Sequence, residues 1–145
     1  MSARSPRGPI VIDTDVFGAE IVPGSRLVAA YDPIIVGRPA FISFQTATEL
    51  RYGALRRNWG PARMLKLETR INEAEIVHSG AELILIHAQL RADCERIGHP
   101  LGQREHNADR WVASVALRLG IPLVSNDGIF RDVPGLTLET ANNSR

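Results

Sequence analysis

The stretch Ile10-Val11-Ile12-Asp13-Thr14-Asp15 decides how this chain folds. Three consecutive β-branched residues, followed at once by acidic and polar side chains, predict a short buried strand that ends at a surface edge. Asp13 then stands at the carboxyl end of that strand, where open α/β sheets form their ligand crevices. Taken alone, Asp13 is explained equally well as a turn or cap residue.

Segments with strand and helix character alternate along the rest of the 145 residues. The pattern predicts further strands at 40–44, 75–77, 121–125 and 137–138, and helices at 25–31, 46–58, 62–71, 81–97 and 107–119. Pro33 is expected to lie beyond the first of these helices. Such alternation is typical of an α/β fold, with a small parallel sheet flanked by helices. We expect one domain at 9–140 and disordered tails at 1–8 and 141–145.

The composition favours a globular protein of a reducing compartment. The net charge is only +1, from 17 basic and 16 acidic residues, which neither demands nor excludes a nucleic-acid partner. Cys94 is the only cysteine, so no intrachain disulfide forms, in agreement with a cytoplasmic location. No apolar run approaches the ~18–20 residues of a membrane span, and we expect no membrane partner.

Three further acidic residues lie at the ends of predicted elements. Asp127 follows a predicted strand, as Asp13 does, whereas Glu49 and Asp109 lie near the start of predicted helices. In a parallel sheet with βα connections, all these positions meet at one edge. Clustered carboxylates repel unless cations compensate, and oxygen-only ligands select hard ions. We therefore expect an Mg²⁺ or Mn²⁺ site formed by Asp13, Glu49, Asp109 and Asp127.

Each of these acids also has a local explanation. Thr46-Ala47-Thr48-Glu49 fits a capping box, in which the glutamate bonds back to the threonine amide. Asp109 would lie in the first turn after an Asn107 cap, where the helix dipole favours an acid by ~0.3–1 kcal/mol. Asn126-Asp127-Gly128 is an ordinary turn sequence. None of these explanations requires four acids at one edge, so the set is more informative than its members.

The histidines do not predict a competing metal site. His78, His87, His99 and His106 lack the HExxH spacing, and one cysteine does not build a structural zinc site. We expect His87 to be a surface or boundary residue of its helix.

Four segments, in order, resemble the PIN-domain ribonucleases, and within them the VapC toxins of bacterial toxin–antitoxin pairs. They are Val11–Asp15, Ile42-Ser43 with Thr46–Gly53, Asn107–Ala113 and Leu123–Asp127. The resemblance covers about residues 9–140 and implies a PIN fold, a Mg²⁺- or Mn²⁺-dependent endoribonuclease and a VapB-like antitoxin in its groove.

Carried over by position, the resemblance makes Asp13, Glu49, Asp109 and Asp127 the metal-site acids and gives Ser125 a supporting role. The family often has asparagine where this chain has Asp15. The local charge is therefore expected to be higher here, with Asp15 either beside the metal ligands or solvated.

Arginines are the candidates for holding RNA phosphates, because 16 of the 17 basic residues are arginine. The predicted RNA contacts are Arg51, Arg56, Arg57, Arg104 and Arg110, and the alternative for each is a solvated helix face. Apolar side chains at predicted helix edges, Phe17, Val28, Trp59 and Met64, favour self-association as a homodimer.

Two other functions remain open from the sequence. Asp13-Thr14-Asp15 also resembles the opening motif of the aspartyl-phosphate phosphatases, which need a downstream lysine. The only lysine, Lys66, lies inside a predicted helix, far from any strand end. The second alternative is a non-catalytic PIN-like module that binds RNA or an antitoxin.

Overall fold

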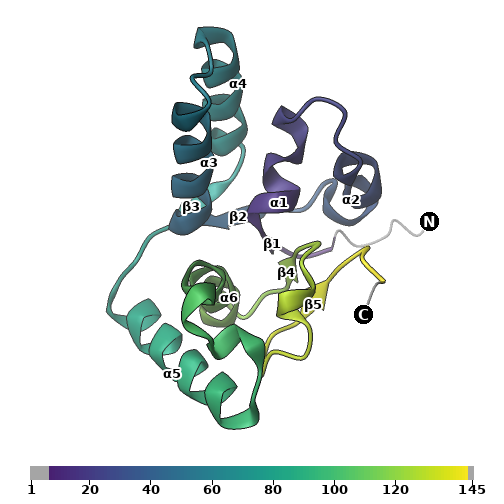
Figure 1. Ribbon diagram of the computed structural model, residues 1–145. Helices are drawn as coiled ribbons and strands as arrows, with labels where there is room; N and C mark the ends of the chain where they lie inside the picture. Colours follow the sequence, from purple (N-terminus) through teal and green to yellow (C-terminus); the bar gives the residue numbers. More distant parts are fainter. Residues whose placement is uncertain (1–6, 144–145) are drawn as a thin grey trace, which may run out of the picture.

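The structure, a computed structural model, describes residues 7–143, and its parallel sheet has the strand order β3-β2-β1-β4-β5 (Figure 1). The strands are β1 (Ile10–Ile12), β2 (Ala40–Ser43), β3 (Glu75–Val77), β4 (Leu123–Val124) and β5 (Leu138–Glu139). The α-helices are α1 (Thr14–Phe17), α2 (Leu27–Ile35), α3 (Phe44–Arg56), α4 (Pro61–Asn72), α5 (Ala81–Ile97) and α6 (Asn107–Leu119). Short 3₁₀ turns are η1 (Gly18–Ile21), η2 (Pro100–Gly102), η3 (Arg104–His106) and η4 (Gly128–Phe130). The predicted α/β fold is confirmed.

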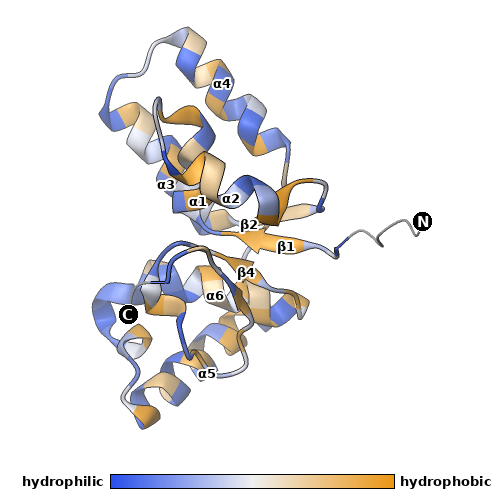
Figure 2. Cartoon of the chain, turned by 90° about the vertical axis from the view of Figure 1, so that its right-hand side faces the viewer, coloured by the Kyte–Doolittle hydropathy of each residue, from blue (hydrophilic) through white to orange (hydrophobic). Residues whose placement is uncertain are grey.

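The two faces of the sheet carry separate apolar cores, because side chains alternate along each strand. Val11 and Leu123 point into a core formed with α5 and α6. Ile10 and Ile12 point to the other face, into a core formed with α1 to α4. Figure 2 shows these two groups of helices on opposite sides of the strands. The result is a three-layer sandwich with β1 at its centre.

The strands are added first on one side of β1 and then on the other. The chain runs outward from β1 through β2 to β3 and then returns to add β4 and β5 on the other side. The parallel register pairs Ile12 with Val124, and the Asp13 amide donates to the Val124 carbonyl at 2.9 Å. Asp13 and Ser125 are thus the first residues beyond two adjacent strands. This is the kind of switch point at which open α/β sheets form ligand crevices.

Several predicted boundaries are confirmed. Helix α5 has the predicted limits and ends at Gly98, whose φ of +73° is left-handed and therefore suits glycine. Strand β3 also has the predicted limits. Strand β4 is shorter than the predicted 121–125.

Helix α2 departs from the prediction at both ends. It starts two residues later than expected and continues past Pro33, which was predicted to lie beyond it. A proline inside a helix removes the hydrogen bond to the carbonyl four residues earlier, here that of Ala29. Since Ala29 is exposed, solvent can satisfy that carbonyl. The helix ends at Ile35, shortly before Gly37 with its φ of +74°.

The ends of the chain are described only in part. Residues 1–6 and 144–145, which belong to the two predicted tails, lie outside the described residues. Within the second predicted tail, the Ala141 amide donates to the Tyr31 hydroxyl at 3.1 Å, and Asn142 Nδ2 donates to the Asn126 carbonyl at 2.7 Å. No helix within residues 7–143 is long and apolar enough to cross a membrane.

Candidate functional site

Asp13 lies at the centre of the sheet edge, and its two carboxylate oxygens have different partners. Its Oδ1 accepts the backbone N–H of Thr14 at 2.7 Å, and its Oδ2 accepts the hydroxyl of Ser125, also at 2.7 Å. The Ser125 oxygen in turn accepts the amide of Asp127 at 3.0 Å. Asp13 is therefore both the cap of α1 and part of a network that links β1 to β4.

The environment of Asp13 disfavours its charge. The side chain is only 7% exposed, and the pKa of its carboxyl is raised to about 8, with burial as the largest cause. The nearby carboxylates of Asp15 and Asp109 contribute to this rise, while the hydrogen bonds from Ser125 and Thr14 oppose it. A buried carboxylate that faces other carboxylates needs a cation to remain ionised at neutral pH.

Glu49 lies in the second turn of α3, and its capping-box explanation is wrong. Ser43 caps α3 by accepting the amide of Gln45 at 3.0 Å, so the helix begins two residues before the predicted start. Thr46 is a buried helical residue whose Oγ1 is 3.0 Å from Thr14 Oγ1. Burial and the charge of Asp109 raise the pKa of Glu49, whose Oε1 accepts from Thr14 Oγ1 at 3.4 Å.

Asp109 lies in the first turn of α6, as predicted. The predicted cap, Asn107, is instead the first helical residue, and His106 occupies the cap position. The imidazole Nδ1 of His106 lies 2.9 Å from Asp109 Oδ2. Asp127 has the turn role that was its alternative explanation, because its side chain accepts the amide of Ile129 at 3.0 Å and caps η4.

Asp15 holds the loop after β4 against the start of α1. Its Oδ2 accepts the backbone amide of Asn126 at 3.2 Å, and its Oδ1 accepts that of Val16. Burial raises the pKa of Asp15, and the charge of Asp127 adds to the shift. Sequence reasoning left the role of Asp15 open, because its position after Asp13 does not show which loop it contacts.

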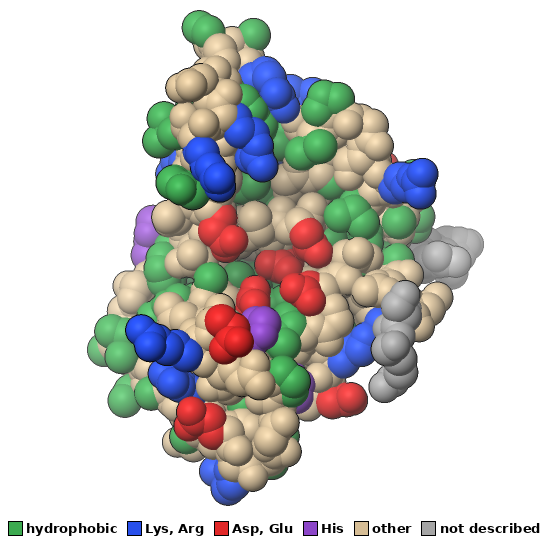
Figure 3. Space-filling model, viewed as in Figure 1, with side chains coloured by type: hydrophobic (Ala, Val, Ile, Leu, Met, Phe, Trp, Pro, Cys, Tyr) green, Lys and Arg blue, Asp and Glu red, His purple; other side chains and the backbone are tan. Residues whose placement is uncertain are grey.

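Electrostatic effects connect these five acids pairwise. The charges of Asp15 and Asp109 raise the pKa of Asp13. The charge of Asp109 raises the pKa of Glu49, and that of Asp127 raises the pKa of Asp15. Figure 3 shows acidic side chains gathered in a hollow at the middle of the molecule. Within residues 7–143, no ion pair with arginine or lysine neutralises these five acids.

The donor chemistry and the uncompensated charge of this acidic site fit a hard divalent cation such as Mg²⁺ or Mn²⁺. The described residues do not, however, contain a ready-formed group of three or more His, Cys, Asp or Glu side chains that could hold a metal ion. Binding would therefore require the carboxylates to move toward the ion.

The five predicted RNA-binding arginines have different environments. Arg110 is 1% exposed and donates to the carbonyls of Leu101 and Gln103 at 2.8 and 2.5 Å, so it cannot reach a phosphate and its prediction is corrected. Arg51 forms a bidentate pair with Glu68. Arg56, Arg57 and Arg104 are exposed.

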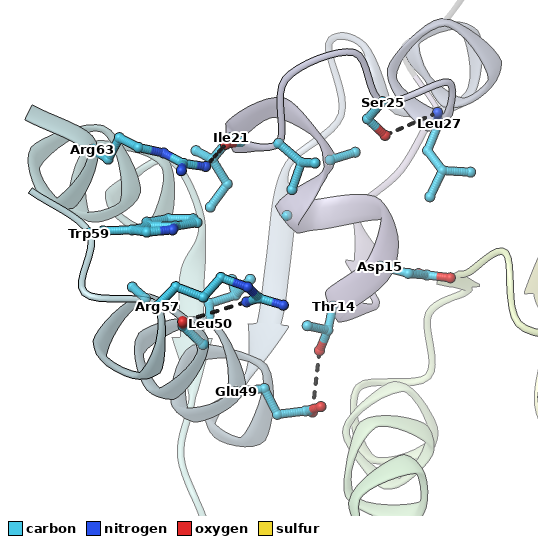
Figure 4. A pocket seen from close by; sticks show the side chains of 15 residues that line it. Thr14, Asp15, Ile21, Ser25, Leu27, Glu49, Leu50, Arg57, Trp59 and Arg63 are labelled. Carbon is cyan, nitrogen blue, oxygen red and sulfur yellow. Dashed lines mark hydrogen bonds between the residues drawn. The ribbon is translucent and has the colours of Figure 1, made fainter.

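A groove of about 530 Å³ begins at the acidic site and runs between η1, α2 and the α3–α4 hairpin. Thr14, Asp15 and Glu49 line one end and Arg63 lies at the other, with Arg57 between them (Figure 4). The walls between them are mainly apolar, from Ile21, Val22, Leu27, Leu50, Ala54 and Trp59. The guanidinium of Arg63 stacks 3.9 Å above the Trp59 ring.

Of the side chains predicted to favour self-association, Phe17 is completely buried in the core. Val28, Trp59 and Met64 are half-buried.

The expectation that His87 is a boundary residue is confirmed, because it is half-buried and stacks on Trp111 with ring centroids 3.9 Å apart.

A family model described as PIN domain matches residues 10–136. No curated protein matches the chain. This family match removes the aspartyl-phosphate phosphatase alternative. The position of Lys66 also argues against a phosphatase, because the only lysine lies on the exposed surface of the α3–α4 hairpin.

Solved structures share the fold at low sequence identity. VapBC2 from Rickettsia felis, bound to a DNA fragment from its promoter, matches with a TM-score of 0.75 and 23% identity over 91% of this chain and 98% of that chain. DNA-bound VapBC from Salmonella typhimurium matches with a TM-score of 0.70 and 23% identity, over 93% and 99%. VapC20 from Mycobacterium tuberculosis, a toxin that cleaves the sarcin–ricin loop, matches with a TM-score of 0.58 and 19% identity, over 82% and 90%.

Proposed function

This chain belongs to the PIN-domain family, and from that premise we propose that it is a divalent-metal-dependent endoribonuclease and the toxin of a VapBC-type pair. The observation that supports this most is the gathering of Asp13, Glu49 and Asp109 at the switch point of the sheet, where no arginine or lysine among residues 7–143 is paired with them. The likeness to VapC20, an RNA-cleaving toxin, supports the substrate class.

Asp13, Glu49, Asp109 and Asp127 would hold the Mg²⁺ or Mn²⁺ ion. When bound, such an ion lowers the pKa of coordinated water and offsets charge on a phosphodiester. The chain's own residues orient the carboxylates: Ser125 fixes one oxygen of Asp13, and Thr14 bridges Thr46 and Glu49. Asp15, which fixes the backbone of Asn126, supports the site without being one of the four ligands.

The RNA strand would reach this site along the α3–α4 hairpin. Arg57 lines the groove together with Glu49, and it also lines a neighbouring hollow with Arg56 and Tyr52. Figure 4 shows the Arg57 guanidinium directed toward the end of the groove that holds Thr14 and Glu49. Among residues 7–143, neither arginine is paired with a carboxylate, and arginines with an exposed aromatic ring are the groups that bind phosphates and stack on bases. Arg51 and Arg104 are weaker candidates, the first because Glu68 already occupies its guanidinium.

The apolar groove would hold a VapB-like antitoxin. Its acidic end fits a basic side chain of such a partner, and its arginine end fits an acidic one, with apolar residues between them. The VapBC complexes among the similar structures support this class of partner.

We also propose a homodimer, on the strength of exposed apolar residues such as Leu55 and Leu85. A cytoplasmic location is proposed as well, since Cys94 is buried and forms no disulfide.

The decisive test is incubation of the purified, antitoxin-free chain with total RNA, in Mn²⁺ and in EDTA. Wild-type protein should cut RNA in Mn²⁺ only, whereas Asp13→Asn, Glu49→Gln and Asp109→Asn should be folded and inactive, which also controls for contaminating nucleases. RNA that is bound and left intact by the wild type would instead identify a non-catalytic binding module.

A further inference from the structure

His106 contacts one of the proposed metal ligands and lines the same hollow as another. Its Nδ1 is 2.9 Å from Asp109 Oδ2, and both side chains are partly exposed. It also lines a hollow of about 520 Å³, of which Asp127 forms another part. We propose that His106 is a positioning residue that holds the carboxylate of Asp109 in the orientation required for metal binding. This inference rests on the proposed function.

The position of His106 is fixed by the helix that carries Asp109. The buried guanidinium of Arg110 donates to the carbonyls of Leu101 and Gln103, in the segment that leads to α6. The His106 amide donates to the same Gln103 carbonyl at 3.1 Å. Because Arg110 follows Asp109 directly in sequence, the residue that clamps this segment moves together with the carboxylate. His106 is therefore held against Asp109 and does not depend on a flexible loop.

The contact selects one orientation of the Asp109 carboxylate. A carboxylate turns easily about its last torsion angle. Without a hydrogen-bond partner, its oxygens would therefore often point away from the metal position. With Nδ1–H of His106 donating to Oδ2, Oδ1 remains available for the cation. Partners of this kind, which orient a ligand without touching the metal, typically change metal affinity or activity by about 10–100-fold when they are removed. A purely structural pair would stabilise the start of α6 and leave metal affinity unchanged.

Two substitutions distinguish the roles of the two imidazole nitrogens. The amide nitrogen of asparagine takes approximately the place of histidine Nδ1, so His106→Asn keeps the donor to Asp109. The amide of glutamine reaches approximately the place of Nε2, so His106→Gln and His106→Ala both lose that donor. His78→Ala is the matched control, because His78 is exposed and belongs to no part of the proposed site.

The measurement is the Mn²⁺ dissociation constant of the full-length chain by isothermal titration calorimetry, without RNA. We expect His106→Ala and His106→Gln to raise this constant about tenfold or more, and His106→Asn to stay within about threefold of wild type. His78→Ala should match wild type. Metal-free melting temperatures should be nearly equal for all variants, which shows that each one folds.

Two results would overturn the inference while the proposed function stands. One is a His106→Ala variant that binds Mn²⁺ and cuts RNA as wild type does. The other is a His106→Asn variant as weak as His106→Ala, because the donor to Asp109 would then not be the cause. A wild-type chain that neither binds Mn²⁺ nor cuts RNA would instead overturn the proposed function, and with it this inference.

Discussion

Ser125 Oγ donates a 2.7 Å hydrogen bond to Asp13 Oδ2, between residues 112 positions apart in the chain. The same oxygen accepts the amide of Asp127 at 3.0 Å. One buried hydroxyl therefore joins the ends of the two central strands and also the two acids that follow them. Its removal affects both the fold and the site.

Ser125→Ala should lower the free energy of unfolding by about 1–3 kcal/mol, since it leaves a buried carboxylate oxygen without its donor. It should also reduce RNA cleavage, because Asp13 loses its fixed orientation. Urea unfolding and a cleavage assay measure the two effects. Ser114→Ala is the matched control: Ser114 is equally buried, but its hydroxyl donates only to the Arg110 carbonyl within α6. Equal losses of activity in the two variants would contradict the role of Ser125.

Stability of the metal-free protein should depend on pH through Asp13. Its folded-state pKa is raised from 3.8 to about 8, so between these values the folded state holds a proton that the unfolded chain has released. This contribution to stability is complete below the unfolded pKa and is lost as pH rises toward 8. Melting temperatures measured from pH 5 to 8 should therefore fall with pH, apart from effects of other groups.

Asp13→Asn should reduce that slope and melt higher than wild type at pH 8 without metal. Saturation of wild type with Mn²⁺ at ~100 times its dissociation constant should add about 2.7 kcal/mol, because the ion binds the ionised folded site and not the unfolded chain. If Mn²⁺ raises the melting temperature of an Asp13→Asn/Asp109→Asn double variant as much as that of wild type, the metal binds elsewhere.

Glu49→Gln should abolish cleavage without weakening α3, because Ser43 and not Thr46 caps that helix. Ser43→Ala should instead cost about 0.5–2 kcal/mol of stability, the usual loss for an N-cap. Thermal unfolding of the two metal-free variants makes the comparison. A Glu49→Gln variant as unstable as Ser43→Ala would restore the capping role.

Arg57→Ala should weaken RNA binding more than Arg51→Ala. Arg57 lines the same groove as Glu49 and has no carboxylate partner among residues 7–143, whereas Arg51 is already paired with Glu68. Loss of one phosphate contact should reduce the salt dependence of RNA affinity, as the slope of log K against log salt, by about 1. Fluorescence anisotropy at several salt concentrations, with catalytically inactive Asp13→Asn as background, measures this slope. An unchanged slope for Arg57→Ala would place the RNA elsewhere.

Val22→Glu should block binding of the antitoxin and leave RNA cleavage intact. Val22 is 51% exposed on the apolar wall of the groove, where a carboxylate would lose hydration on contact with an apolar partner. Co-purification with the antitoxin tests this, with Ile97→Glu on α5, 58% exposed and outside the groove, as control. Loss of the partner in both variants would indicate general destabilisation.

The sequence by itself determined the succession of strands and helices along the chain and placed acids after strands and at helix starts. Short β-branched runs can be read locally, and the geometry of a parallel sheet brings the residues after such strands to one edge. Asp13 and Asp127 follow β1 and β4 as predicted, and the limits of α5 agree with its apolar spacing and with Gly98. These features depend on neighbouring residues and on the period of each element.

Only the tertiary structure decided which neighbours the polar groups have. Arg110 looked like a phosphate ligand, yet it is buried against carbonyls of the preceding segment, and Asp15 bonds to Asn126, 111 positions away. Likewise, the cap of α3 moved to Ser43 because β2 ends there, which left Glu49 for the site. A polar side chain has several partners of similar energy available locally, and packing of distant segments selects among them.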